Sequence, residues 1–156
     1  MIQPLFNADN DQWVVMTGRY ILNMGAVEMA TRLLIAQILG NNTAHICRDD
    51  LSARIGFIRS RFPKSNSARH KWAMNAFEVA NKHTGFRNII AHSPLAITGH
   101  ANGTFKIQGI IDLTPKDKSL TAQLISLEEL TSRVDEAAML GRQLLEMQND
   151  FITSVD

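Results

Sequence analysis

A six-residue segment near the middle of the chain carries side chains suited to chemistry on a phosphate. The segment 87–92 reads RNIIAH, and Pro94 follows one residue later. An arginine guanidinium matches phosphate oxygens in pairs, and imidazole is the side chain best suited to moving protons near neutral pH. Because the residue before a proline is driven out of the α region, Pro94 predicts that a helix stops here. We therefore expect a phosphate site at a helix end, built from Arg87, Asn88 and His92.

Helix geometry limits what one copy of this segment can do. Asn88 and His92 are four residues apart, so they share a face of a helix. Arg87 and His92 are five residues apart and point about 140° away from each other around the axis. Arg87 therefore reaches the same ligand only if the helix opens near Gly85, or if the ligand lies between two symmetry-related copies.

The reaction that these groups suggest is RNA cleavage without a metal ion. The 2′-hydroxyl must lose a proton to attack the adjacent phosphorus, and the 5′-oxygen must gain one as it leaves, so two proton-transfer groups are needed. Fixed cations stabilise the charge on the phosphoryl oxygens. One chain offers one well-placed histidine, whereas a twofold dimer offers two copies of His92 and two of Arg87 around one cleft. The chemistry thus predicts a homodimer acting on RNA.

Charge is distributed unevenly, although the formal net charge is only +1. Residues 51–77 hold six cationic side chains and no acidic one, while residues 126–156 hold seven acidic and two cationic side chains. Such asymmetry predicts one face that attracts polyanions. The RNA-binding candidates are Arg54, Arg59, Arg61 and Lys64. The alternative is two helices with solvated faces of opposite sign.

Composition bounds the class of protein. At 156 residues, with 45% hydrophobic and 20% charged side chains, the chain 1–156 is expected to be one soluble domain. Its single cysteine, Cys47, excludes an internal disulfide, and its histidines lack the spacing of a metal site. The start of the chain has no secretion pattern, and charged residues interrupt its longest apolar run. We expect a cytoplasmic protein with no cofactor, metal or membrane contact.

The hydrophobic pattern predicts mostly helices, with strand-like alternation confined to a stretch before the last helix. Asn102-Gly103 is a strong hairpin turn signal, and Ser126 with Glu129 forms a capping box at the start of the last helix. The expected helices are 9–39, 48–62, 67–83 with a kink or restart at Gly85, and 126–153; the expected strands lie around 97, at 105–113 and at 121–125. The fold class is therefore mainly α, a four- to five-helix bundle with a small β-meander inserted before the last helix. The first helix is apolar on most sides, which predicts a core helix or a subunit interface.

The motif and this layout resemble the HEPN superfamily. The shared features are the Arg-polar-x-x-x-His segment at a helix end, a long first helix with a Gly25-x-x-Glu28 segment, and a closing helix. The resemblance implies a small α-helical dimer of HEPN type. Many such members are metal-independent endoribonucleases of toxin–antitoxin or phage-defence systems, often encoded beside a nucleotidyltransferase-like partner. Arg87 would stabilise the phosphate, Asn88 would orient it and His92 would transfer protons. Some members carry a tyrosine where this chain has Pro94.

Two other readings of the same residues stay open. In the first, the domain is a non-catalytic HEPN-like module that binds a protein partner, a nucleotide or RNA. In the second the motif is structural: Arg87 pairs with Glu28 or another acid, and His92 caps the helix C-terminus. Glu28 is otherwise a support candidate for the site or an ion-pair partner of Arg32. The remaining histidines, including His83, are expected on the surface or in loops.

Overall fold

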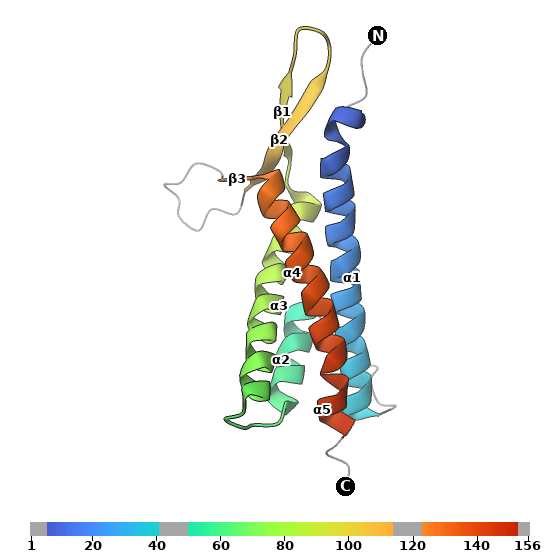
Figure 1. Cartoon of the computed structure of the whole chain (residues 1–156), viewed down its shortest axis with the longest axis vertical. Coiled ribbons are helices and arrows are strands. Elements are labelled where there is room, and N and C mark those ends of the chain that lie inside the picture. Colours follow the sequence, from blue (N-terminus) through green and yellow to red (C-terminus); the bar gives the residue numbers. More distant parts are fainter. Residues whose placement is uncertain (1–5, 41–49, 114–122, 153–156) are drawn as a thin grey trace. The chain divides into compact units, whose positions relative to one another are not determined.

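The computed structural model describes residues 6–40, 50–113 and 123–152. The chain is mainly helical, with a small three-stranded antiparallel sheet before the last helices (Figure 1). This confirms the predicted mainly α class. In order, the elements are a 3₁₀ turn η1 (Ala8–Asn10), α1 (Asp11–Leu39), α2 (Leu51–Arg61), α3 (Ala68–His92), β1 (Leu95–Gly99), β2 (Phe105–Asp112), β3 (Gln123–Ile125), α4 (Leu127–Glu146) and α5 (Gln148–Ile152).

Two compact units can be distinguished, and three helices contribute residues to both. Unit 1 comprises residues 1–22 and 86–135, and unit 2 comprises residues 23–85 and 136–156. Unit 1 holds the sheet and the segment 87–92, whereas the described part of unit 2 holds helices and their connections and no strand. The single-domain organisation expected from chain length stays a prediction.

In unit 1, β2 is the central strand, paired with β1 on one side and with β3 on the other. The predicted Asn102-Gly103 turn is present, and Gly103 takes a φ of 82°, a left-handed conformation that favours glycine. The buried Asn10 amide donates a hydrogen bond to the Phe105 carbonyl oxygen and accepts one from the Ile107 N–H, each at 2.9 Å. This amide holds the start of α1 against β2.

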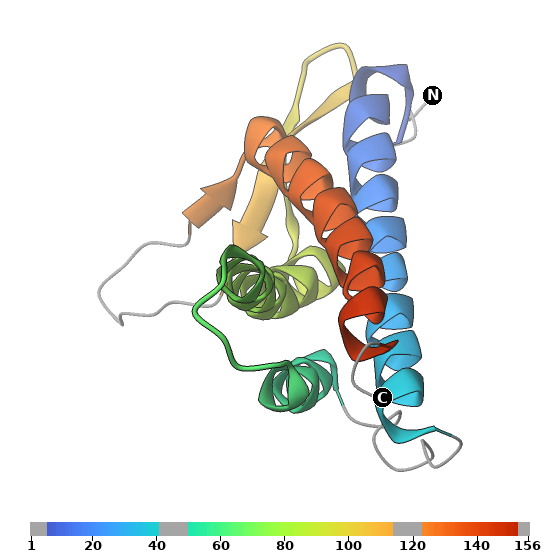
Figure 2. The ribbon, with the colours of Figure 1, turned by 60° about the horizontal axis from the view of Figure 1, so that its bottom comes forward.

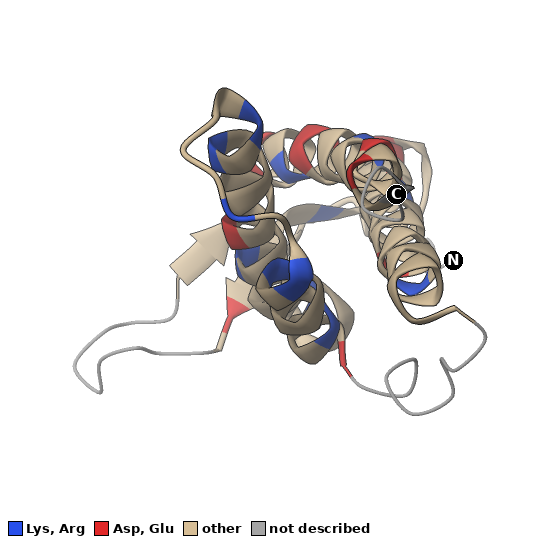
Figure 3. Cartoon of the chain, turned by 90° about the horizontal axis from the view of Figure 1, so that it is seen from below, with Lys and Arg blue, Asp and Glu red and all other residues tan. Residues whose placement is uncertain are grey.

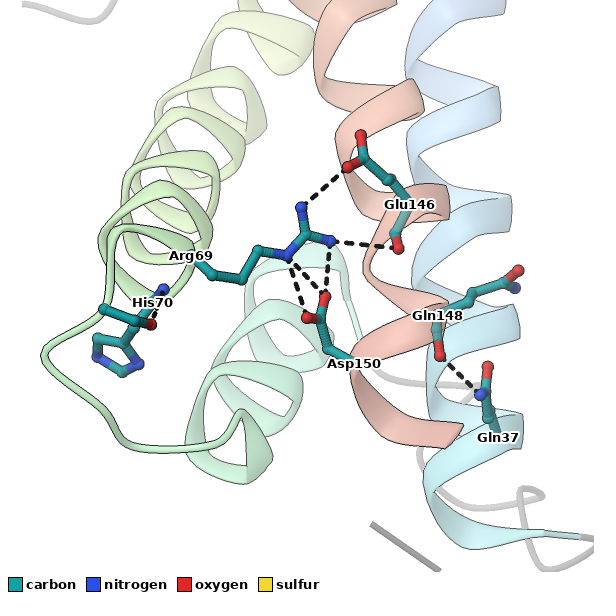
Figure 4. A network of polar contacts seen from close by, with 7 residues as sticks. Gln37, Arg69, His70, Glu146, Gln148 and Asp150 are labelled. Carbon is teal, nitrogen blue, oxygen red and sulfur yellow. Dashed lines mark hydrogen bonds and ion pairs between the residues drawn. The ribbon is translucent and has the colours of Figure 1, made fainter. Parts of the chain in front are cut away.

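In unit 2, helices close around a core of aliphatic and aromatic side chains; α2 and the first turns of α3 run side by side (Figure 2). Phe62, at the C-terminal end of α2, packs edge-to-face on Phe77 of α3 and on Phe151 of α5. Arg69 bonds the carboxylates of Asp150, at 2.7 Å, and Glu146, at 2.9 Å (Figure 4). The hydrogen bond to Asp150 and then that to Glu146 raise the pKa of Arg69. The Arg69 guanidinium therefore stays charged throughout the ordinary pH range.

Capping residues mark the helix boundaries at several ends. Gly40 ends α1 with a φ of 64°, and the Glu129 N–H donates to the Ser126 side-chain oxygen at 3.1 Å, at the start of α4. The Asp50 side chain caps α2 by accepting from the Ala53 N–H. The single last helix expected over 126–153 is instead two, α4 and α5, separated at Met147. The first part of the expected third strand, 121–122, lies outside the described residues.

The break expected at Gly85 does not occur, because α3 runs without interruption from Ala68 to His92. A glycine inside a helix costs about 1 kcal/mol relative to alanine. Burial of Phe86 and Ile90 on the following turns opposes that cost. Helical packing therefore outweighs the local preference of one residue.

Replacing Gly85 with alanine should stabilise the protein by about 0.5–1 kcal/mol, because the change removes the glycine cost in a continuous helix. A Cβ at Gly85 meets no atom within 4 Å, so the methyl group fits. Thermal unfolding measures the effect. Gly109→Ala is the matched control with the opposite sign, because a Cβ there would lie 2.7 Å from the Ile125 carbonyl oxygen. A lower melting temperature for Gly85→Ala would show that the helix needs a break at this position.

One stretch, Ala8–Leu39, is long and apolar enough to cross a membrane by length and composition. Its most apolar 18-residue window holds at most two charged residues. In the structure 33% of this window is buried. The core helix of a soluble protein and an N-terminal signal sequence meet the same test, so this finding is weak evidence for a membrane span.

Candidate functional site

The segment 87–92 forms the last turns of α3, and the helix stops at the predicted place. α3 ends at His92, the Ser93 N–H donates to the Ile89 carbonyl oxygen at 2.9 Å, and β1 begins just after Pro94. The motif is thus held on a helix and followed at once by a strand, both within unit 1. A site built on such elements is better fixed than one on a loop.

Apolar neighbours fix the orientation of this helix end. Phe86 and Ile90 are buried. The ring of Phe86 packs edge-to-face on Tyr20, with 5.2 Å between centroids, and the Arg133 guanidinium lies over it at 5.3 Å. These contacts turn the opposite side of the helix outward.

The three candidate residues, Arg87, Asn88 and His92, are exposed. Within the described part of the chain, no ion pair or hydrogen bond involves the His92 side chain, and this imidazole is open to a ligand. Because α3 is continuous through Gly85, the helical angles apply without correction. Asn88 and His92 share a face, while Arg87 lies about 140° around the axis from His92. The structure brings two of the three side chains together and leaves the third on another part of the exposed surface.

Glu28 lies beside a cationic side chain that the sequence did not single out as its neighbour. Its carboxylate lies 3.8 Å from the Arg54 guanidinium, within unit 2. Arg54 also donates from Nε to the Thr31 side-chain oxygen at 3.1 Å. Glu28 therefore has a structural partner of its own in the helical unit, and the structure gives no observation that links it to phosphate chemistry.

Arg54 is the clearest correction among the predicted RNA-binding residues. Its side chain is 4% exposed, because it lies on the inward side of α2 between Glu28 and Thr31. A phosphate in solvent cannot reach a guanidinium in this position. The charge count in the sequence includes Arg54, but its place in the helix puts it with the buried Leu51, Ile55 and Ile58.

The other three predicted RNA-binding residues are exposed. Arg59 and Lys64 line a groove at the corner between α2 and α3. Arg61 is not among its lining residues, and its guanidinium lies 5.3 Å from the centre of the Phe57 ring. Lys and Arg residues are spread over α2, the following loop and α3 (Figure 3). The structure thus divides the four candidates into a buried one, a pair in one groove and one beside that groove.

His83 is a residue that sequence reasoning placed wrongly. It was expected on the surface or in a loop, yet it is 1% exposed, and its Nε2 lies 3.3 Å from the Glu136 carboxylate in unit 2. The signal was present in the helical spacing. Ala76, Ala80 and His83 fall at intervals of four and three residues, which places them on one buried face of α3.

No group of three or more metal-ligating side chains lies together in residues 6–40, 50–113 and 123–152. The charged groups at the motif are one guanidinium and one imidazole, which suit an anion rather than a cation. The arrangement offers proton transfer from His92, amide hydrogen bonding from Asn88, and a cation on the adjacent surface.

Comparison of the chain with models of protein families, with curated proteins and with solved structures found no match in any of the three. The resemblance to the HEPN superfamily therefore depends on the segment 87–92 and on the order of the elements. What this resemblance implies about activity and partners belongs to the proposal that follows.

Proposed function

We propose that this protein is a metal-independent endoribonuclease of HEPN type, whose site is completed by a second copy of the chain. The observation that carries the proposal is the orientation of the motif. Arg87, Asn88 and His92 are exposed, while the buried side chains of Phe86 and Ile90 together hold the helix in place. The His92 imidazole faces solvent, where a proton-transfer group can reach an RNA strand.

The roles follow from the chemistry of transesterification. His92 accepts the proton of the 2′-hydroxyl as its oxygen bonds to the adjacent phosphorus, and the bond from phosphorus to the 5′-oxygen breaks. A second His92, from the other copy, donates the proton that the 5′-oxygen takes up. Arg87 stabilises the charge on the non-bridging oxygens, and Asn88 orients the phosphate through its amide. The products carry a 2′,3′-cyclic phosphate and a 5′-hydroxyl.

The continuity of α3 makes the second copy necessary. A single chain holds Arg87 and His92 on parts of the helix about 140° apart, and it holds only one imidazole at this end. Two copies around a twofold axis place the Arg87 of one copy beside the His92 of the other.

An exposed apolar face on α1 supports the presence of a partner copy. Val15, Leu22 and Met29 recur every seven residues and are 44%, 75% and 55% exposed. Gly18 and Gly25 fall between them, and an added Cβ at either meets no atom within 4 Å. Apolar residues at this interval form the seam of paired helices, and the glycines allow close approach. The same face is self-complementary when two copies of α1 run antiparallel with Leu22 near the centre.

Leu22→Lys should therefore convert the protein from a dimer to a monomer and remove RNA cleavage with it. A lysine in the seam places a charge where the partner helix would pack, and its burial is strongly unfavourable. Sedimentation velocity measures the mass, and cleavage of a labelled RNA measures the activity. Met139→Lys is the matched control, because Met139 is 63% exposed on a different helix, α4. If Leu22→Lys stays dimeric and active, the α1 interface is wrong.

The direct test of the activity is incubation of RNA with the pure protein in EDTA, followed by analysis of the product ends. The proposal expects cleavage in the absence of divalent ions and a 2′,3′-cyclic phosphate on the 5′ fragment. Intact RNA would overturn it. RNA binding without cleavage would favour the non-catalytic module instead, and the steepness of its salt dependence would report the phosphate contacts.

The cellular setting belongs to the same proposal. A cytoplasmic toxin or phage-defence ribonuclease needs a means of silencing, and a nucleotidyltransferase-like antitoxin is the partner that the HEPN resemblance implies. Co-purification of the chain with the product of the neighbouring reading frame tests this. A partner that forms a stable complex and stops RNA cleavage would support the toxin–antitoxin assignment.

A further inference from the structure

The groove at the corner of α2 and α3 lies in unit 2 and has a volume of about 750 Å³. Pockets that hold small organic ligands have volumes of roughly 300–1,000 Å³. Its wall combines two kinds of surface, an apolar floor and a rim of polar and cationic side chains. The motif 87–92 belongs to the other unit and has no part in its lining.

Gly56, Phe62 and Met74 form the apolar floor. Phe62 is 4% exposed and fixed by its aromatic neighbours, so it is a rigid base for a ligand. A Cβ added at Gly56 meets no atom within 4 Å, which leaves open space above this turn of α2. A flat, weakly polar group matches such a surface.

The rim is cationic. Arg59 and Lys64 are exposed, and none of the residues that line the groove is acidic. The nearby carboxylates of Glu146 and Asp150 are already bonded to Arg69 (Figure 4). An anion in the groove therefore meets two positive charges and no carboxylate in the wall.

His70 adds an oriented imidazole to the same wall. Its Nδ1 lies 2.9 Å from the Pro63 carbonyl oxygen, and a carbonyl can only accept, so Nδ1 carries the proton. The Nε2 atom is then the free position of the ring. Although Arg69 and His70 are adjacent in sequence, their side chains diverge, and only His70 lines the groove (Figure 4). Hydroxyl and amide groups from Ser65 and Asn66 complete the rim.

We propose that this groove binds one nucleotide of an RNA strand, with the base on the apolar floor and the phosphate between Arg59 and Lys64. Inorganic phosphate would use only the rim, and an acidic peptide would leave the floor unused, whereas a nucleotide uses both surfaces. The choice of RNA as the polymer rests on the proposed ribonuclease function. The binding of a nucleotide in the groove rests only on the residues that line it.

The test measures binding of a fluorescent 2′-O-methyl RNA 12-mer to the wild-type protein. This probe lacks the 2′-hydroxyl nucleophile, so binding is read without cleavage. Arg59→Glu and Lys64→Glu should each weaken binding at least 10-fold. Replacing both residues should lower the magnitude of the slope of log affinity against log salt by about 0.7, because the groove neutralises one phosphate of the single strand. Lys82→Glu is the matched control, because Lys82 is an exposed cation on α3 outside the lining, and it should change binding less than threefold.

The floor is tested by a second pair of variants. Gly56→Met fills the space above the floor and should weaken binding at least 10-fold without lowering the melting temperature, because methionine is the better helix former. Gly56→Ala leaves the space open and should bind as the wild type does. Adenosine monophosphate should displace the probe at concentrations at least 10-fold below those needed for inorganic phosphate.

Three results would overturn the proposal. Lys82→Glu could weaken binding as much as Arg59→Glu, which would mean that net surface charge alone attracts the strand. Gly56→Met could leave binding unchanged, or inorganic phosphate could compete as well as the nucleotide. Any of these, with RNA still cleaved in EDTA, would reject the groove and retain the ribonuclease. Binding that follows the groove variants with no cleavage at all would retain the groove and reject the ribonuclease.

Discussion

His92→Ala should lower the rate constant for RNA cleavage in EDTA by at least about 100-fold and leave the melting temperature unchanged. Loss of a general acid–base group typically costs a factor of 10² to 10⁴. The imidazole is exposed at the end of α3, so its removal creates no cavity. A gel-based single-turnover assay and a thermal melt measure the two quantities on the same sample.

His100→Ala is the matched control, because it removes another exposed histidine from unit 1, at the β1–β2 turn. It should cleave RNA at the wild-type rate. Equal rates for His92→Ala and wild type would exclude His92 from the chemistry. A fall in melting temperature that accounts for the lost activity would favour the structural reading of the motif.

A heterodimer of wild type and His92→Ala tests the composite nature of the site. It keeps both copies of Arg87 but only one imidazole, so one of the two proton transfers loses its group. Co-expression with two different affinity tags isolates this heterodimer. Its cleavage rate should fall by about 100-fold or more rather than by half, and a rate of half the wild-type value would argue against a shared site.

Arg54→Ala should destabilise the fold by about 3 kcal/mol, the low end of the cost of breaking a buried ion pair. The substitution removes the 3.8 Å pair with Glu28, the hydrogen bond to Thr31 and a large buried side chain. The low end applies because the Glu28 side chain is 23% exposed and water can still reach its carboxylate. Urea unfolding followed by circular dichroism measures the change.

Arg59→Ala is the counterpart on the same helix. It should alter the free energy of unfolding by less than about 0.5 kcal/mol, as surface substitutions usually do, while weakening RNA binding. If Arg54→Ala is as stable as wild type and loses RNA affinity, the Arg54 guanidinium binds RNA at the surface, and the structural role given to it above is contradicted.

The sequence is informative where short-range chemistry decides the structure. The hairpin at Asn102-Gly103, the capping by Ser126 and the helix stop before Pro94 are set by conformational preferences of a few residues, and each was predicted correctly. The same kind of reasoning failed at Gly85, where packing of Phe86 and Ile90 on distant residues outweighs the local cost.

Contacts between distant segments account for most of what was missed. The charge pattern counts Arg54 with its neighbours, but its burial depends on Glu28 and Thr31 of another helix. Arg69 bonds Asp150 across 81 residues of sequence, a pairing that no local pattern encodes. His83 could have been placed by helical phase alone, because it shares the buried face of Ala76 and Ala80. At the motif, the side-chain types and the helical angles follow from the sequence, whereas the exposure of Arg87, Asn88 and His92 could be seen only in the structure.

The contact between Asn10 and the sheet affects whether folded copies of the chain can aggregate through the edge of the sheet. β3 pairs only with Ile110–Asp112 of β2, so the peptide groups of Phe105 and Ile107 lie beyond the stretch that β3 covers. The Asn10 side chain takes up one carbonyl oxygen and one N–H there, as a neighbouring strand would. Unpaired peptide groups on a sheet edge are a template for adding a foreign strand. The Asn10 amide, in the 3₁₀ turn η1, thus protects this part of β2 from edge-to-edge aggregation.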